Sequence, residues 1–537
     1  MESDPTRMCE LLVGLPEVNV LSIDDVVGDP LRVHIEGRSK RPGCAGCGVF
    51  AQVKDRPVVE LVDLPCFGRA TRLIWHKHRW RCPESSCSTT SWIGKEHRIG
   101  APRMAMSDRA GRWVTEQVGR YARSVNEIAV ELGCDWHTVN DTVIAYGTAL
   151  VDDPQRFGTV EALGLDEVLF ARIGTWHRQD FSTQIVDVGV GQLLDVVPGR
   201  SSVEPMVWLA KQGKPWRDQV RFATLDLSGP YRKVFTVMVP DAVQVADPFH
   251  VVKLANTKLD ECRRRVQNET MGHRGHKADP LYRCRRLLTK AEERLDEKGR
   301  EKLIGLLKAG DPKGDVATVW KAKEAVRELY AHRDPDLALQ WVTELARDLQ
   351  DNDYSIEARL LGRTLKRWKH QIAAWHAAQV SNGPTEAVNN LIKRVKRAAF
   401  GFTSFRNYRI RSLLYAGKPN WDLLKSIKPA VIPENRQTPL ISEEPANESA
   451  TVEPTATGAG NVVVVGDPRR LDDADVVEHE AAPRRTVSSP IMMMIRRTLT
   501  VCSTRQWKAQ SAPKAGHPHD CQADSLKRNV SLPLLYR

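Results

Sequence analysis

The sequence predicts a multidomain α/β protein, in which a small β-rich module and a helical segment precede a larger domain built on a mixed sheet. Length is the first reason, because 537 residues exceed the ~100–200 residues of a typical single domain. The second reason is the pattern between residues 158 and 250, where short apolar runs alternate with helical periodicity. The third is the almost wholly helical, highly charged pattern between residues 251 and 380.

The charge balance favours a polyanionic partner, nucleic acid above all. The formal net charge is +12, and a basic chain binds polyanions with an affinity that falls as salt rises. The alternative is a basic soluble protein with a solvated charged surface. No apolar run reaches the ~20 residues of a membrane span, and the N-terminal residues lack the pattern of a signal peptide. We therefore expect a cytoplasmic, nucleoid-associated protein that does not contact a membrane.

Residues 1–100 are predicted to form a zinc-ribbon-like DNA-binding module. Runs such as LRVHIEG and VVELVDLP are typical of short strands. Two cysteine pairs accompany them, Cys44 with Cys47 and Cys82 with Cys87. Four thiolates in this arrangement suit one structural Zn²⁺. Because the second pair is more widely spaced than the first, His76 and His78 are alternative ligands, and the competing interpretation is two unrelated cysteine pairs.

Residues 101–155 are predicted to form a helix-turn-helix domain. Apolar residues recur at helical spacing, Gly133 is placed to end the first helix, and Asp135 is placed to cap the second. The second helix would present its first residues to a DNA major groove, namely Trp136, His137, Thr138 and Asn140. The alternative is an ordinary helical hairpin.

Residues 156–427 are predicted to form the catalytic domain. We expect strands at 163–170, 182–190, 192–197, 219–225 and 242–247, and a helix at 201–212. Successive strands followed by helical crossovers fit a mixed sheet of RNase H-like type. Residues 251–380 would be a helical insertion in this domain. Residues 428–537 are rich in Pro, Glu, Thr, Ala and Gly without periodicity, which predicts a disordered or aberrant tail.

Three acids are the candidate catalytic residues. Asp166 and Asp226 each punctuate a strand-like run, and Glu386 opens a basic stretch with helical periodicity. Carboxylates delivered this way can hold two Mg²⁺ or Mn²⁺ ions about 4 Å apart, which promote phosphoryl transfer on nucleic acid. Taken singly, each acid is more simply a solvated side chain. Basic residues that could hold a phosphate backbone follow Glu386, namely Lys393, Arg394, Lys396 and Arg397.

Asp247 and His250 form a second, weaker motif. They follow an apolar run in the sequence DPFH, at the predicted mouth of the last strand. An isolated Asp and His in such a place are more often structural than catalytic. Asp247 nevertheless competes with Asp226 for the role of second acid. Topology favours Asp226, because it ends the first strand after the first helix of an RNase H-like sheet.

Taken together, these motifs resemble the DDE transposases of the ISL-three family of insertion sequences. The resemblance runs over residues 20–420 and is most specific in VADPFHVVKLAN and SNGPTEAVNNLIKRVKR. It implies a catalytic triad of Asp166, Asp226 and Glu386, in which Asp166 bridges both ions. It also implies a protein that binds the terminal inverted repeats of the element, cleaves its ends and transfers the freed 3′-hydroxyl to target DNA. We further expect at least a dimer on double-stranded DNA.

Two other functions explain part of the sequence. A DNA-binding regulator would use the zinc module and the helix-turn-helix without catalysis, but it gives no reason for acids on three elements. A metal-dependent nuclease without strand transfer shares the acids. An assay of DNA joining separates the nuclease from the transposase.

Overall fold

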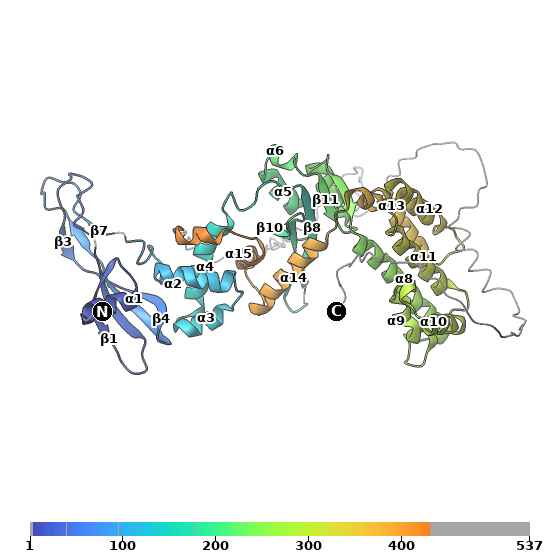
Figure 1. Ribbon diagram of the computed structural model, residues 1–537, viewed down its shortest axis with the longest axis horizontal. Helices are drawn as coiled ribbons and strands as arrows, with labels where there is room; N and C mark the ends of the chain where they lie inside the picture. Colours follow the sequence, from blue (N-terminus) through green and yellow to red (C-terminus); the bar gives the residue numbers. More distant parts are fainter. Residues whose placement is uncertain (1–3, 39, 95, 177, 430–537) are drawn as a thin grey trace, which may run out of the picture. The chain divides into compact units, whose positions relative to one another are not determined.

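The structure is a computed structural model that describes residues 4–429, except residues 39, 95 and 177. Apart from Lys428 and Pro429, the predicted tail at 428–537 therefore lies outside the described residues. The described chain contains three β-sheets, with four, five and three strands (Figure 1). None of its described helices is long and apolar enough to cross a membrane.

The β-rich N-terminal part consists of helix α1 (Pro5–Val13) and two sheets. Its strands are β1 (Val18–Asp24), β2 (Leu31–Gly37), β3 (Gln52–Asp55), β4 (Val58–Cys66), β5 (Arg69–His76), β6 (Arg79–Arg81) and β7 (Ser91–Ile93). The larger sheet has the order β1-β2-β5-β4 and the smaller the order β3-β6-β7. Val33 and Ile35 alternate with less buried neighbours along β2, which is the pattern of a sheet with one face on a core.

Three helices follow, α2 (Asp108–Gly119), α3 (Val125–Leu132) and α4 (Trp136–Val151). The predicted turn between the last two is confirmed. Gly133 ends α3 with a left-handed backbone, φ 59°, and the Asp135 side chain accepts the N–H of Thr138 to cap α4. Arg72 of β5 donates to the carbonyl oxygens of Leu132 and Gly133, so the first sheet holds this turn.

The central sheet contains β8 (Ala162–Ile173), β9 (Arg178–Asp187), β10 (Gln192–Pro198), β11 (Phe222–Leu225) and β12 (Val243–Ala246). Its order is β10-β9-β8-β11-β12. The first three strands pair antiparallel in succession, whereas β11 lies parallel to both β8 and β12. The predicted strands are confirmed in number and order. The hairpin of β8 and β9 is longer than predicted, because pairing continues to Ile173 and Arg178.

Both faces of this sheet are buried in hydrophobic cores. On β9, Ile185 belongs to one core and its neighbour Val186 to the other, and Leu194 and Leu193 divide in the same way on β10. This alternation follows from the two-residue period of a strand. The first core also receives α5 (Val203–Lys211) and α7 (Gly229–Met238), which flank the short α6 (Lys214–Arg217). The second receives helices α2 to α4, which were predicted as a separate domain.

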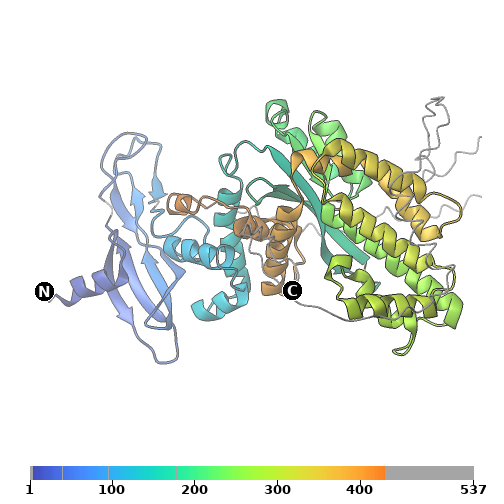
Figure 2. The same ribbon diagram turned by 45° about the vertical axis from the view of Figure 1, so that its right-hand side comes forward.

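The predicted helical insertion at 251–380 is confirmed as helical, and its helices lie side by side in Figure 2. Its helices are α8 (Pro248–Met271), α9 (Pro280–Thr289), the 3₁₀ helix η1 (Glu292–Arg294), α10 (Glu297–Gly310), α11 (Asp315–Leu329), α12 (Pro335–Asp348) and α13 (Ile356–Ala378). Their buried hydrophobic residues belong to the first core of the central sheet. Arg265 joins three of these helices, since it pairs with Asp315 and Glu357.

The chain then returns to the central sheet. Helix α14 (Gly383–Ala398) packs against β8 and β9, and α15 (Phe405–Ala416) packs against β10 and α4. The 3₁₀ helix η2 (Trp421–Lys425) completes the described chain. Val388 and Ile392 of α14 are buried in the second core. Helix α14 therefore has one face on the sheet, while Lys393, Arg394 and Arg397 are exposed on the other.

Candidate functional site

Three aspartates stand at one edge of the central sheet. Leu165 of β8, Leu225 of β11 and Ala246 of β12 lie in register, and each is followed by an aspartate: Asp166, Asp226 and Asp247. Because these strands run parallel, the three aspartates lie side by side where β11 and β12 end, although β8 itself continues to Ile173. The strand pairing thus explains why acids that are far apart in the sequence come together.

Asp166 and Asp226 form a cluster with Glu167. One carboxylate oxygen from each lies within 4.8 Å of the other two, a spacing at which they could hold a metal ion. Glu167 was not among the residues predicted from the sequence, since adjacent strand residues ordinarily face opposite sides. Its only sequence signal was its position beside Asp166. The backbone N–H of Glu167 also donates to Oδ1 of Asp166, at 2.8 Å.

The carboxylates of the cluster oppose one another electrostatically. Burial, followed by the charges of Asp166 and Glu167, raises the pKa of Asp226 to about 7. Burial is also the main cause that raises the pKa of Asp166. Oδ1 of Asp226 is buried without a hydrogen-bond partner among the described residues. Asp226 therefore has a buried acceptor oxygen beside two further acids. A bound cation would balance the negative charge of these carboxylates.

Glu386 approaches this cluster from α14 but is not part of it. It lies in the first turn of the helix and is exposed. Its charge still contributes to the raised pKa of Asp166, after burial and the charge of Glu167. On the same helix, Asn389 donates from Nδ2 to Oδ2 of Asp166 at 2.7 Å. Helix α14 therefore contacts the predicted catalytic acid directly.

Asn382 anchors the start of α14 to the sheet edge. Its backbone N–H donates to Oδ1 of Asp247 at 3.1 Å, and its Oδ1 accepts the hydroxyl of Thr224 at 3.0 Å. Its Nδ2 donates to the carbonyl oxygen of Leu165 at 3.4 Å. One buried asparagine thus connects all three parallel strands to the helix that carries Glu386, through its side chain and its backbone N–H. This role of Asn382 was not predicted from the sequence.

Asp247 and His250 lie beside the cluster and outside it. Asp247 is buried, and its Oδ2 lies 3.0 Å from Nδ1 of His250. Burial opposes the protonated imidazole, but the hydrogen bond to Asp247 and the charges of Asp247, Asp226 and Asp166 outweigh burial and raise the pKa of His250. Asp247 therefore holds α14 and His250, while Asp226 occupies the cluster.

The four cysteines of the N-terminal part form a second cluster. Their sulfur atoms all lie within 4.8 Å of one another, a group that could hold a metal ion. The Sγ atoms of Cys44 and Cys87 are 3.7 Å apart, and those of Cys47 and Cys82 are 3.4 Å apart. The alternative ligands are engaged elsewhere, since Nε2 of His76 lies 3.1 Å from Nδ1 of His34 and His78 pairs with Glu36.

Comparison with known proteins finds relatives of this chain among transposases. Residues 163–412 match the model of the ISL-three transposase family, described as a transposase. Over these residues the chain belongs to this family of transposases. The transposase for insertion sequence element IS1557 of Mycobacterium tuberculosis is 29% identical over 440 residues, which cover 74% of this chain and 92% of that protein. The transposase for insertion sequence element IS1001 of Bordetella parapertussis is 24% identical over 383 residues, covering 70% of this chain and 89% of that protein.

The matched region of the transposase family contains Asp166, Asp226 and Glu386, together with the basic residues of α14. Lys393, Arg394 and Arg397 are exposed. Lys396 is less exposed, and its Nζ donates to the carbonyl oxygen of Leu169 on β8. Three of the four predicted phosphate contacts are therefore free of the sheet, and the fourth braces α14 against it.

The predicted DNA-reading residues begin α4, before the region that matches the transposase family. Trp136 and His137 are exposed, whereas Thr138 is partly used in the cap, since its hydroxyl donates to Asp135 at 2.7 Å. Asn140 departs from the expectation. It is buried, with 6% of its surface exposed, and its Oδ1 accepts a hydrogen bond from Asn407 of α15 at 3.3 Å. Packing of α15 against α4 removes this side chain from the exposed face.

Proposed function

We propose that this chain is a DDE transposase that binds the terminal inverted repeats of an insertion sequence, cleaves the ends and transfers the freed 3′-hydroxyl to target DNA. One observation carries the proposal. Within the region that matches the transposase family, Asp166 and Asp226 converge at the carboxyl edge of a sheet. Glu386 stands on a helix hydrogen-bonded to Asp166 through Asn389. The names of the relatives support transposition as the overall process.

The catalytic domain is proposed to be RNase H-like. Its support is the strand order β10-β9-β8-β11-β12, with antiparallel pairing on one side of β8 and parallel pairing on the other. The proposed domains keep the boundaries derived from the sequence: a zinc-ribbon-like module at 1–100, a helix-turn-helix at 101–155 and the catalytic domain at 156–427. Helices α2 to α4 share the second core with the central sheet, which supports a helix-turn-helix packed onto the catalytic domain.

Asp166, Asp226 and Glu386 are proposed to hold two divalent cations, with Glu167 as a further acid beside them. The buried, unpartnered Oδ1 of Asp226 and the mutual repulsion of the acids fit this role. When bound, Mg²⁺ or Mn²⁺ would polarise the attacked phosphodiester and favour deprotonation of the attacking water or hydroxyl. The chain's own part is to fix the acids: Asn389 and the N–H of Glu167 each take one oxygen of Asp166.

The remaining residues are proposed to hold DNA. Exposed Lys393, Arg394 and Arg397 lie on the helix that begins with Glu386, so a phosphate backbone bound there would lie along the helix that carries an acid of the site. Trp136 and His137 would contact the terminal repeat. The four cysteines would hold one structural Zn²⁺. Two ends must be held together during transposition, so we propose at least a dimer on double-stranded DNA.

The alternatives make less use of these residues. A DNA-binding regulator needs the N-terminal residues alone and leaves the buried acids of the central sheet without a role. A nuclease without strand transfer uses the acids equally well. The difference between the nuclease and the transposase is chemical, since only the latter makes a new phosphodiester bond.

The decisive experiment measures nicking and joining of a DNA fragment that carries the element's end, with Mg²⁺ or Mn²⁺. The intact chain is compared with Asp226→Asn. Cleavage at the end boundary that is lost in the variant, together with a joined product, is expected. Cleavage without joining would favour the nuclease. Binding of the end without cleavage in either metal would favour the regulator.

A further inference from the structure

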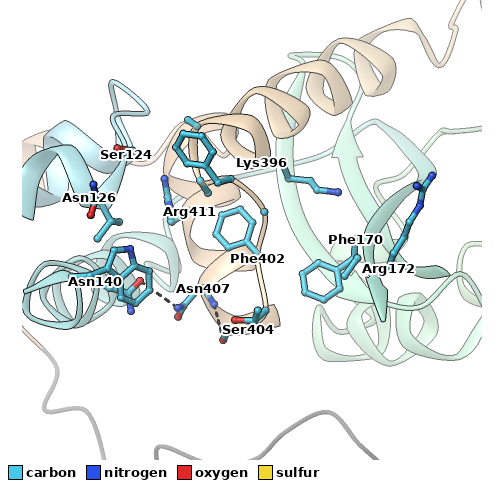
Figure 3. Close-up of a pocket in the computed structure, with 18 of the residues that line it drawn as sticks. Ser124, Asn126, Asn140, Phe170, Arg172, Lys396, Phe402, Ser404, Asn407 and Arg411 are labelled. Carbon is cyan, nitrogen blue, oxygen red and sulfur yellow. Dashed lines mark hydrogen bonds between the residues drawn. The ribbon is translucent and has the colours of Figure 1, made fainter. Parts of the chain in front are cut away.

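A pocket of about 520 Å³ lies between the helix-turn-helix and the catalytic domain. Its walls come from the starts of α3 and α4, from the end of β8, and from the segment that joins α14 to α15. Figure 3 shows Asn126 and Asn140 on one side, Phe170 and Arg172 on the other, and Phe402 and Arg411 between them. The proposed catalytic acids do not line it, so its purpose is not explained by the metal site.

Arg411 is the unusual residue of this pocket. Only 4% of its surface is exposed, and its Nε and Nη2 have no hydrogen-bond partner among the described residues. Burial lowers the pKa of Arg411 to about 10. Buried guanidinium groups are ordinarily paired, because an unmatched buried charge is strongly destabilising. The orphaned N–H groups therefore indicate a ligand with acceptor atoms.

The rest of the lining suits a flat aromatic ligand with a negative charge. Phe402 lies against Arg411, whose Cζ is 5.2 Å from the centre of the ring. Trp136 and Phe170 add two further aromatic side chains. Every charged residue that lines the pocket within the described chain is basic, since Lys396 and Arg172 accompany Arg411. Aromatic faces that stack bases and arginines that bind phosphate or base acceptors are the two elements of single-strand recognition.

We propose that this pocket binds one unstacked nucleotide of a DNA strand. The base would stack on Phe402, and acceptor atoms of the phosphate or of the base edge would take the N–H groups of Arg411. A strand is favoured over a free nucleotide because the pocket is lined by Trp136, which begins the proposed DNA-reading helix, and by Lys396 in the basic part of α14. This inference rests on the proposed function, and it adds a site where DNA leaves the duplex stack.

The test uses the full chain and a short single-stranded oligodeoxynucleotide that contains one 2-aminopurine. Stacking in the pocket is expected to quench the 2-aminopurine fluorescence on binding. Arg411→Met is expected to weaken binding about tenfold and to remove the quenching. Arg406→Met is the matched control, since Arg406 is exposed on the same helix and does not line the pocket. Its affinity and quenching should equal those of the intact chain.

Phe402→Leu keeps the charge and guards against a failure of Arg411→Met to fold, which thermal unfolding would reveal. It is expected to remove most of the quenching with a smaller loss of affinity. Equal quenching by the intact chain and Phe402→Leu would overturn the proposal. So would displacement of the oligonucleotide by deoxyadenosine monophosphate at the same concentration, which would assign the pocket to free nucleotides.

The Asp226→Asn variant separates this inference from the proposed function. The variant is expected to bind the oligonucleotide with unchanged quenching, because Asp226 does not line the pocket. Quenching that depends on Arg411 in a chain that never cleaves DNA would support the pocket and count against the transposase chemistry. Cleavage and joining by a chain without quenching would do the reverse.

Discussion

Asn389 donates a hydrogen bond from Nδ2 to Oδ2 of Asp166 at 2.7 Å, and it stands one helical turn beyond Glu386 on α14. The backbone N–H of Glu167 occupies the other oxygen of Asp166. Residues three apart on a helix are neighbours, so the helix that presents Glu386 also orients Asp166. This contact joins two of the proposed catalytic acids in one rigid arrangement.

Asn389→Ala should therefore weaken metal binding, so that DNA cleavage needs a higher metal concentration. Loss of a hydrogen bond to a metal-binding carboxylate typically lowers metal affinity or activity by about 10–100-fold. We expect the Mn²⁺ concentration for half-maximal nicking to rise within that range. Asn390→Ala is the control, because Asn390 is exposed in the same turn of α14 and accepts a hydrogen bond from Lys393. An unchanged Mn²⁺ midpoint in Asn389→Ala would assign Asn389 to folding alone.

Gly164→Ala should disturb the packing of α14 against β8. A Cβ at this position would lie 2.4 Å from Oγ1 of Thr385 and 2.7 Å from Oδ1 of Asn382. Overpacking of this kind typically costs about 1–3 kcal/mol of unfolding free energy. Gly158→Ala is the control, since nothing lies within 4 Å of its added Cβ. Urea unfolding of both variants measures the difference, and equal midpoints would show that α14 moves aside without cost.

The sequence could predict the order of the central strands and the positions of Asp166 and Asp226, because these acids punctuate strand-like apolar runs. It could not predict that Glu167 joins them, since strict alternation places neighbouring side chains on opposite faces. Asn382 and Asn389 carry no sequence signal either. Their roles depend on where α14 meets the sheet, which is a contact between residues more than 130 positions apart.

Packing between distant segments also explains the other differences. Asn140 has the position of a DNA-reading residue on α4, but α15 covers it through Asn407. The charged, helical pattern of residues 251–380 correctly predicted that this segment is helical. The apolar faces of its helices nevertheless complete one core of the central sheet, which helical periodicity within each segment does not reveal.

Glu386→Gln and Glu167→Gln test which acid completes the metal site. The family resemblance and the charge effect of Glu386 on Asp166 favour Glu386, whereas the geometry of the cluster includes Glu167. We expect Glu386→Gln to abolish end cleavage, as removal of a metal ligand should, and Glu167→Gln to retain measurable cleavage. Binding to the end, measured by gel shift without metal, should be unchanged in both. Full activity of Glu386→Gln with an inactive Glu167→Gln would transfer the role to Glu167.

The raised pKa of Asp226 predicts that the metal-free protein becomes less stable as pH rises. The pKa is about 7 in the folded chain and about 3.9 for an unfolded Asp. The folded state therefore binds the proton more tightly, and stability is lost as pH rises from about 4 through 7. In EDTA, Asp226→Asn should unfold at a higher temperature than the intact chain at pH 8, and this difference should shrink toward pH 5. A difference independent of pH would mean that Asp226 ionises freely, as it would if water reached it.

Removal of zinc should weaken DNA binding more than it disturbs the acid cluster. The four cysteine sulfurs belong to loops of the small β3-β6-β7 sheet, and no hydrogen bond or core in the described chain links them directly to the acid cluster. Cys82→Ser should lower bound zinc from one ion per chain to none, whereas Cys66→Ser, a cysteine outside the cluster, should retain it. Elemental analysis measures the zinc content per chain, and a gel shift measures binding to the DNA end. Zinc retained by Cys82→Ser would show that the thiolates do not hold it. If zinc is lost but the affinity for the DNA end is unchanged, the zinc site has only a structural role. A closed four-thiolate site contributes by ordering its loops.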